Sequence, residues 1–161
     1  MAREAAPVLI AYDGSEVARA AVGHAGDLFA GRPAVVATVY EPGLATIPVG
    51  LPDTMGLGTL PPDPETIEAV DRLQREHASA VAADGAEFAR SVGLVAEPQT
   101  VPDAVDVADT LIHIAQERGA AVVVVGSHGI SGLRTRLLGS VARKLIEHCD
   151  RPVLVIRDRR S

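Results

Sequence analysis

Four glycines lie between residues 126 and 141, directly after the apolar run 120–125. Glycine lets a backbone approach an anion closely and adopt a positive φ. The segment ends on Gly139-Ser140, a step typical of the start of a helix. A helix N-terminus offers free N–H groups and a partial positive charge, both of which attract anions. A strand, a glycine-rich loop and a helix in this order predict a site that holds the phosphates of a nucleotide.

The spacing of these glycines differs from that of two common phosphate-binding motifs. Walker A requires a lysine after its last glycine, and the only lysine of the chain is Lys144, outside such a motif. The dinucleotide fingerprint G-x-G-x-x-G is also absent. The pattern present is G-x2-G-x9-G-S, formed by Gly126, Gly129, Gly139 and Ser140.

Charge and composition narrow the class of ligand. The formal net charge is −6, yet residues 134–161 hold eight basic and three acidic side chains, so cations gather after the glycine loop. We interpret them as favouring an anionic ligand. The chain has only two tyrosines and two phenylalanines, too few to form a stacking platform for nucleic acid. It has no apolar run long enough to span a membrane, and its single cysteine fits a reducing cytoplasm.

Apolar runs alternate with helical periodicities along the chain, which indicates an α/β fold. Strands are expected at 7–12, 34–40, 94–100, 120–125 and 152–157, and helices at 15–30, 64–91, 103–118 and 139–149. Pro98 cannot donate to a ladder, which favours a sheet edge for its strand. The strand 120–125 is apolar on both faces and is expected near the centre. The alternation implies a parallel sheet covered by helices on both faces.

In such a sheet a ligand lies beyond the carboxyl ends of the strands, where the strand order reverses. Asp13 follows the first strand and Gly126 follows the fourth. If these two strands flank the reversal, Asp13 and the glycine loop face one crevice. The connection 41–64, with six prolines and four glycines, is expected to form a partly packed flap, and the chain 1–161 to form one domain. Asp63 before Pro64 predicts the start of the next helix.

These motifs resemble those of the ATP-binding branch of the universal stress protein family. The resemblance rests on the G-x2-G-x9-G-S spacing, on the terminal strand Pro-Val-Leu-Val-Ile at 152–156 and on Asp13-Gly14-Ser15 after the first strand. It covers residues from about 6 to 158. We therefore predict a three-layer α/β sandwich of the adenine-nucleotide-hydrolase-like kind. Its five-stranded parallel sheet has the order 3-2-1-4-5.

The resemblance also implies roles for individual residues. Asp13 would contact the adenosine part of ATP or a metal-bound water, and the backbone of Val39 would contact the adenine edge. The segment 126–132 would wrap the ribose and phosphates, and the helix start at 139–141 would hold the β and γ phosphates. Mg²⁺ commonly bridges such phosphates. The predicted binding residues are Ala11, Asp13, Val39, Gly126, Ser127, His128, Gly129, Gly132, Gly139, Ser140 and Val141.

Other reactive side chains are given structural interpretations. The remaining histidines lack ligand spacing, so no protein metal site is predicted. Asp103, Asp106 and Asp109 are three residues apart and are interpreted as complementing a helix dipole. Cys149 lacks an evident activating neighbour. No catalytic residue is predicted, because nothing clearly positions a water for attack on a phosphate.

The predicted function is that of a cytoplasmic, ATP-binding stress-response regulator or sensor with an unknown protein partner. An apolar last strand at a sheet edge invites pairing with a second copy, so a homodimer through strand 153–157 is expected. Three alternatives stay open. The chain binds another adenine nucleotide such as AMP or cyclic AMP, it is a slow ATPase, or it is a dimeric scaffold without a ligand.

Overall fold

One parallel sheet of five strands, in the order β3-β2-β1-β4-β5, organises the molecule. The computed structural model describes residues 5–42, 63–130 and 138–157. Residues 43–62 of the predicted flap 41–64 and the loop residues 131–137, Gly132 among them, lie outside the described residues. Along the chain the elements are β1 (Val8–Ala11), α1 (Glu16–Phe29), β2 (Pro33–Tyr40), α2 (Pro64–Ser91), β3 (Val95–Pro102), α3 (Val107–Glu117), β4 (Val122–Gly126), α4 (Ser140–His148) and β5 (Val153–Ile156).

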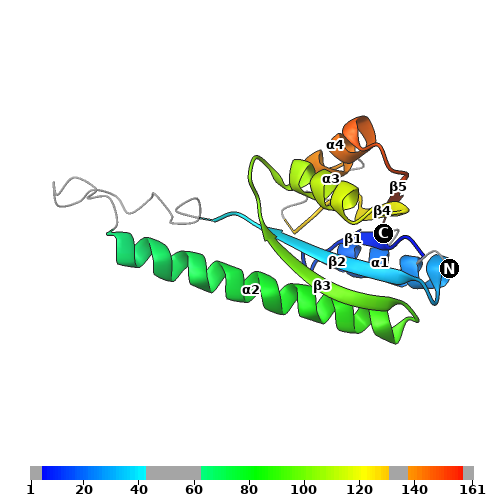
Figure 1. The fold of residues 1–161 in the computed structure, drawn as a ribbon, viewed down its shortest axis with the longest axis horizontal. Helices are drawn as coiled ribbons and strands as arrows, with labels where there is room; N and C mark the ends of the chain where they lie inside the picture. The colour runs from blue at the N-terminus through cyan, green and yellow to red at the C-terminus, as the bar shows by residue number, and fades with distance from the viewer. Residues whose placement is uncertain (1–4, 43–62, 131–137, 158–161) are drawn as a thin grey trace.

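The helices form one layer on each face of the sheet, so the predicted three-layer sandwich is confirmed. Figure 1 shows α2 on one side of the sheet and α3 with α4 on the other. Residues of α1 and α2 share a hydrophobic core with Val8 and Ile10 of β1. Residues of α3 and α4 share a second core with Leu9, the strand residue between them. Successive side chains of a strand point to opposite faces, which is why β1 contributes to both cores.

The strand order confirms three expectations from the sequence. β4 pairs with β1 and with β5, which places it inside the sheet, as expected from its apolar sequence. β3 pairs with β2 alone among the described strands, so Pro98 does lie in an edge strand. β5 forms the other edge. The chain builds β2 and β3 on one side of β1 and β4 and β5 on the other, so the strand order reverses between β1 and β4.

Local signals set most of the helix ends. The Ser15 hydroxyl accepts from the Ala18 N–H at 3.1 Å, and the Asp63 carboxylate accepts from the Thr66 N–H at 2.7 Å with Pro64 at the first helical position. Gly31 and Gly93 end α1 and α2 with φ of 78° and 96°, values that side chains disfavour. α2 spans 28 residues, or about 42 Å.

The predicted third helix needs a correction. It begins at Val107, four residues later than the expected start at Asp103, because β3 continues to Pro102 and Asp106 is the N-cap. The Asp106 carboxylate accepts from the Asp109 N–H at 2.9 Å. Asp103 therefore lies in the connection before α3 and cannot complement its dipole from within the first turn.

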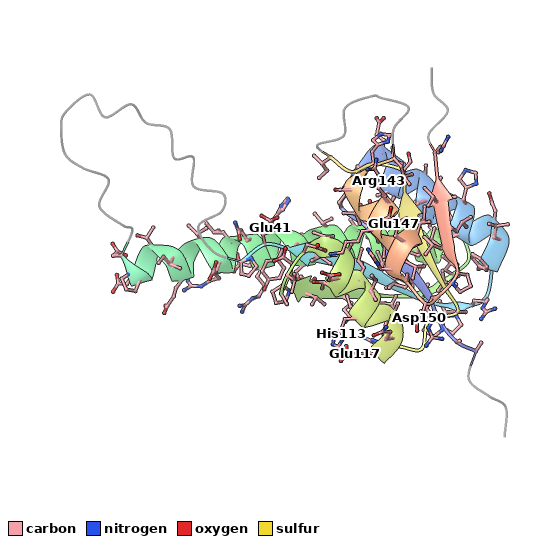
Figure 2. The ribbon with its side chains drawn as sticks, turned by 90° about the horizontal axis from the view of Figure 1, so that it is seen from above. Glu41, His113, Glu117, Arg143, Glu147 and Asp150 are labelled. Atoms are coloured by element: carbon pink, nitrogen blue, oxygen red, sulfur yellow. The ribbon has the colours of Figure 1, made fainter. Side chains whose placement is uncertain are left out.

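The helix layer formed by α3 and α4 is called the outer layer from here on. Its charged side chains lie at its surface. His113 and Glu117 form an exposed pair one turn apart on α3, with 3.3 Å between the imidazole and the carboxylate. Figure 2 places this pair at one end of the layer and Arg143 and Glu147 of α4 at another. Among the described residues, no helix is long and apolar enough to cross a membrane.

Candidate functional site

A cavity of about 100 Å³ opens at the carboxyl ends of β1, β2 and β4, where the strand order reverses. We call it the central crevice. It is lined by Ala11, Tyr12, Asp13, Ala18, Ala37, Val39, Val107, Leu111, Val125, Gly126, His128, Gly129 and Val141. Seven of the eleven predicted binding residues are in this set: Ala11, Asp13, Val39, Gly126, His128, Gly129 and Val141.

Asp13 joins the two loops that border the crevice. One carboxylate oxygen accepts from the Ser15 N–H at 3.0 Å, and the other accepts from the Ile130 N–H at 3.1 Å. Residues 117 positions apart in the sequence are thereby held together. The prediction that Asp13 and the glycine loop face one crevice is confirmed. Since its two oxygens accept the N–H groups of Ser15 and Ile130, Asp13 holds the loop after β4 in place and also brings a negative charge to the crevice.

The glycines of the loop are required by close packing. A Cβ on Gly126 would lie 2.7 Å from a methyl carbon of Val17, and one on Gly129 would lie 2.7 Å from a carboxylate oxygen of Asp13. A Cβ on Gly139 would lie 3.1 Å from the Ser127 carbonyl oxygen. None of these three glycines has a positive φ, so their role here is close approach alone. Gly14, across the crevice, does have φ 79°.

Ser127 connects the loop to the elements on either side of it. Its N–H donates to the Ile156 carbonyl at the end of β5, and its own carbonyl accepts from the Gly139 N–H, both at 2.7 Å. Its hydroxyl lies 3.1 Å from Nδ1 of His128. This contact orients the His128 ring at the edge of the crevice.

The N-terminus of α4 lies beside this loop. Gly139 is the N-cap and makes no side-chain capping hydrogen bond, and Ser140 is the first helical residue. Ser140 is exposed, so its hydroxyl group is accessible at the start of the helix. The first N–H groups of a helix have no partner within the helix and carry partial positive charge. This end of the crevice is therefore suited to an anion.

The opposite end of the crevice combines apolar side chains with the main-chain groups of Val39 at the end of β2. The Tyr12 N–H donates to the Ala37 carbonyl on the β1 side of β2, whereas the Asp103 N–H donates to the Tyr40 carbonyl on the β3 side. Main-chain groups of successive strand residues point alternately to the two neighbours. Those of Val39 consequently point toward the side of β1, which has ended at Ala11. A flat heterocycle that lies there would meet a donor and an acceptor between aliphatic walls.

Sequence reasoning missed two features that shape this site. Tyr12 is buried, and its hydroxyl donates to Asp84 of α2 at 2.9 Å; burial first, and then this hydrogen bond, raise the pKa of the phenol. Val107 and Leu111 of α3 form part of the aliphatic wall. An apolar residue at the carboxyl end of a strand or in the first turn of a helix carries no sequence signal for a ligand, so neither feature was accessible.

The basic residues after the loop are not all available to an anion. Lys144 donates to the carboxylates of Asp106 and Asp109 at 2.5 and 2.7 Å, which corrects its assignment to the ligand. Arg134 and Arg136 lie outside the described residues. Among the described residues, no group of three His, Cys, Asp or Glu side chains could hold a metal ion.

Comparison with known proteins now decides the family. The sequence model of the universal stress protein family matches residues 5–157. The chain belongs to the universal stress protein family. It is 28% identical to the universal stress protein YxiE of Bacillus subtilis over 161 residues, which cover 93% of this chain and 97% of YxiE.

Two solved structures illustrate the relationship of this universal stress protein to others. The fold is similar to that of MJ0577, the protein of Methanocaldococcus jannaschii, with a TM-score of 0.75 at 22% identity over 99% of this chain and 100% of that one. It is also similar to a universal stress protein solved in complex with cAMP, with a TM-score of 0.62 at 25% identity over 92% and 94% of the two chains. The five-stranded parallel sheet is thus the family fold.

Proposed function

We propose that this protein binds an adenine nucleotide, ATP with Mg²⁺, in the central crevice and acts as a stress-response regulator or sensor. The observation that carries the proposal is the two-ended character of the crevice. Aliphatic side chains and the peptide groups of Val39 suit a base, whereas the loop 126–130 and the start of α4 suit phosphates. The relative solved with cAMP supports an adenine ligand in this family.

Nine of the eleven predicted binding residues are given individual roles in this proposal. Ala11 and Val39 border the base, and Asp13 lies between the base end and the loop. Ser127, His128 and Gly129 border the phosphates, which Gly139, Ser140 and Val141 would contact through backbone amides and the Ser140 hydroxyl. Mg²⁺ binds few protein groups and prefers phosphate oxygens and water. Asp13 is the one carboxylate among the described residues that line the crevice, and the proposal needs no further protein ligand.

The same residues favour holding a nucleotide over splitting it. In-line attack on a phosphate needs a group that positions the attacking water. The carboxylate oxygens of Asp13 accept backbone N–H groups, and Nδ1 of His128 is within hydrogen-bond distance of the Ser127 hydroxyl. We therefore expect steady-state phosphate release near background. Release well above background would establish the slow ATPase instead.

The proposal is tested first by what the protein already carries. Protein purified without added nucleotide is denatured, and the released small molecules are identified by mass spectrometry. We expect adenine nucleotide in near-stoichiometric amount, together with thermal stabilisation by millimolar ATP and Mg²⁺. Ligand at one hundred times its Kd stabilises a fold by about 2.7 kcal/mol. An empty protein that millimolar ATP does not stabilise would refute the proposal.

Variants separate the remaining alternatives. Gly129→Val and Gly139→Val place side chains against Asp13 and the Ser127 carbonyl, so ATP should no longer raise their melting temperatures. Gly23→Ala, where a Cβ meets no atom within 4 Å, is the matched control and should respond like the parent protein. A ligand-free scaffold predicts no response to ATP in any of them. Equal affinity for AMP and ATP would indicate that no contact is made to the γ phosphate.

The proposal includes a homodimer through the free edge of β5. The Pro152 carbonyl accepts from the Val123 N–H of β4, and the Ile156 carbonyl accepts from the Ser127 N–H directly after β4, so the main-chain groups of Val153 and Val155 point away from β4. Val155→Pro removes an outward N–H and leaves the pairing with β4 in place. We expect a dimer by analytical ultracentrifugation and a monomer for the variant. A monomeric parent protein would refute this part. Action in the cytoplasm, with an unidentified protein partner, belongs to the same proposal.

A further inference from the structure

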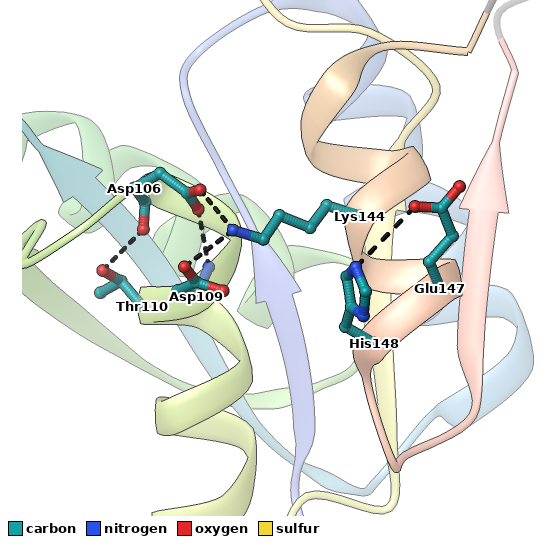
Figure 3. A network of polar contacts seen from close by, with 6 residues as sticks. All are labelled: Asp106, Asp109, Thr110, Lys144, Glu147 and His148. Carbon is teal, nitrogen blue, oxygen red and sulfur yellow. Dashed lines mark hydrogen bonds and ion pairs between the residues drawn. The ribbon is translucent and has the colours of Figure 1, made fainter.

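The only lysine of the chain joins the two helices of the outer layer. Lys144 lies in the second turn of α4, and its ammonium group donates to Asp106 at 2.5 Å and to Asp109 at 2.7 Å. Figure 3 shows the lysine side chain extending from α4 to both carboxylates at the start of α3. Asp106 is also the N-cap of α3, and its carbonyl accepts from the Thr110 hydroxyl at 3.0 Å. We call this contact the Lys144 bridge.

The Lys144 bridge lies next to the wall of the central crevice. On α3, Asp106 directly precedes Val107, which lines the crevice. On α4, Val141 also lines the crevice and lies three residues before Lys144, a spacing that places two side chains on one side of a helix. The bridge therefore fixes the distance between the two helices at the level where both contribute side chains to the crevice.

α4 has few other anchors. Two of its nine residues, Ala142 and Leu145, are buried, and both belong to the core beneath the helix. Its N-cap is a glycine without a side-chain hydrogen bond. The backbone bond from Gly139 to Ser127 holds the first residue, and Lys144 is held from the side by α3. A helix of this length can tilt about its buried residues unless a lateral contact prevents it.

We propose that Lys144 is a positioning residue, which holds the N-terminus of α4 where its amides meet the phosphates of the bound ligand. This inference rests on the proposed function of the crevice. The ammonium group is paired with two carboxylates, so it acts through the position of the helix and makes no contact with the ligand. Loss of the bridge then weakens ligands in proportion to their contacts with α4. The affinity for ligands that carry phosphates is therefore lowered, whereas the affinity for a nucleoside without phosphates is unchanged.

The test measures affinities of the full-length chain for ATP with Mg²⁺ and for adenosine by calorimetry. Lys144→Met should weaken the affinity for ATP about fivefold, which is the scale of a helix-terminus interaction, and leave the affinity for adenosine unchanged. Lys144→Arg, which can also reach both carboxylates, should restore ATP binding. Arg118→Met is the matched control because it removes a 2.8 Å ion pair with Glu97 at the other end of α3, away from the crevice. It should bind both ligands like the parent protein.

Two results would overturn the inference. One is an equal loss of ATP and adenosine affinity in Lys144→Met, which would mean that the bridge supports the fold generally. The other is full recovery of ATP affinity in the triple variant Lys144→Met, Asp106→Asn, Asp109→Asn, which would mean that the lysine acts only by neutralising two carboxylates. If Lys144→Met fails to fold, Asp109→Asn removes one arm of the bridge and is measured against the same ligands.

Failure of the proposed function is recognised separately. If the parent protein binds neither ATP nor adenosine, the nucleotide proposal fails, and tripolyphosphate is then the probe. Binding of tripolyphosphate that Lys144→Met weakens and Lys144→Arg restores would support the positioning role for another phosphorylated ligand. A parent protein that binds no tripolyphosphate, or a variant that binds it equally well, would overturn the inference as well.

Discussion

The helix α2 and the layer formed by α3 and α4 meet the sheet through side chains of different size. The buried residues of α2 are all small: Ala78, Ala82, Gly85, Ala86 and Ala89. The outer layer, formed by α3 and α4, buries large side chains, of which Leu111, Ile114 and Leu145 are at most 1% exposed. Both arrangements exclude water from a face of the same sheet, but they do so by different means.

This difference shows which helix, α2 or α4, can move more easily relative to the sheet. Small residues bring the backbone of α2 against the sheet side, where a Cβ on Gly85 would lie 2.5 Å from the ring of Tyr12. Such a contact leaves no room for movement. On the other side, α4 is held by Leu145, Ala142 and the Lys144 bridge. The helix α4, which supplies the anion-binding end of the crevice, is thus held by two buried residues, whereas α2 is held by five.

The largest expected effect tests how much α4 depends on one side chain. Leu145→Ala should lower the free energy of unfolding by about 3 kcal/mol, since it leaves a cavity under a fully buried residue. Ile146→Ala, at the neighbouring position that is 52% exposed, should change it by no more than about 0.5 kcal/mol. Urea unfolding measures both. Similar losses for the two variants would contradict the comparison of the layers.

The next effect tests the close contact of α2, and its sign is decisive. Gly85→Ala should destabilise the protein by about 2 kcal/mol, because the added methyl group overlaps the ring of Tyr12. Gly23→Ala in α1 meets no atom within 4 Å and should stabilise it by about 0.5 to 1 kcal/mol through helix propensity. Thermal unfolding followed by circular dichroism distinguishes the two. Stabilisation by both would show that α2 can move away from the sheet.

The smallest effect concerns the Lys144 bridge and appears as a dependence on pH. The Lys144 ammonium group, followed by the Asp109 N–H, lowers the pKa of Asp106 below its ordinary value of 3.8. Asp106 and Asp109 raise the pKa of Lys144 above 10.5. A lowered carboxyl pKa contributes stability that is present above the ordinary value and lost as the pH falls through the lowered one. A raised lysine pKa contributes stability that is lost as the pH rises through it.

The parent protein should therefore be more stable than Lys144→Met at neutral pH, and the difference should shrink below about pH 3.8. Urea midpoints of the two proteins at neutral pH and in acid measure this difference. Arg118→Met, which removes an exposed ion pair elsewhere on α3, serves as the comparison. A difference that stays constant into acid would contradict the lowered pKa of Asp106 in the folded protein.

Most of the fold follows from signals that act over a few residues. Ser15 and Asp63 cap their helices because a short polar acceptor before an amphipathic run satisfies a free N–H wherever the helix lies. The exception is α3, where a strand continued past the expected helix start and Asp106 became the cap. The end of β3 stays in the sheet because it pairs with β2. Such pairing is not visible in the local sequence.

The candidate site was predictable where its residues follow the ends of strands. Parallel strands bring their carboxyl ends to one edge, so Asp13 and the loop after β4 were expected to meet. The reason for the glycines was not predictable. Gly126 and Gly129 are needed because Val17 and Asp13 approach them, and those contacts exist only once α1 and both loops are assembled.

The sequence by itself determined the family, the alternation of strands and helices, and the segments that border the crevice, because each depends on residue order and spacing. Only the tertiary structure decided what the charged groups do. Lys144 lies near the glycine loop in the sequence, yet it pairs with Asp106 and Asp109, 38 and 35 residues earlier. The direction of a side chain from a helix depends on how that helix is turned against its neighbour, and packing across the outer layer sets that angle.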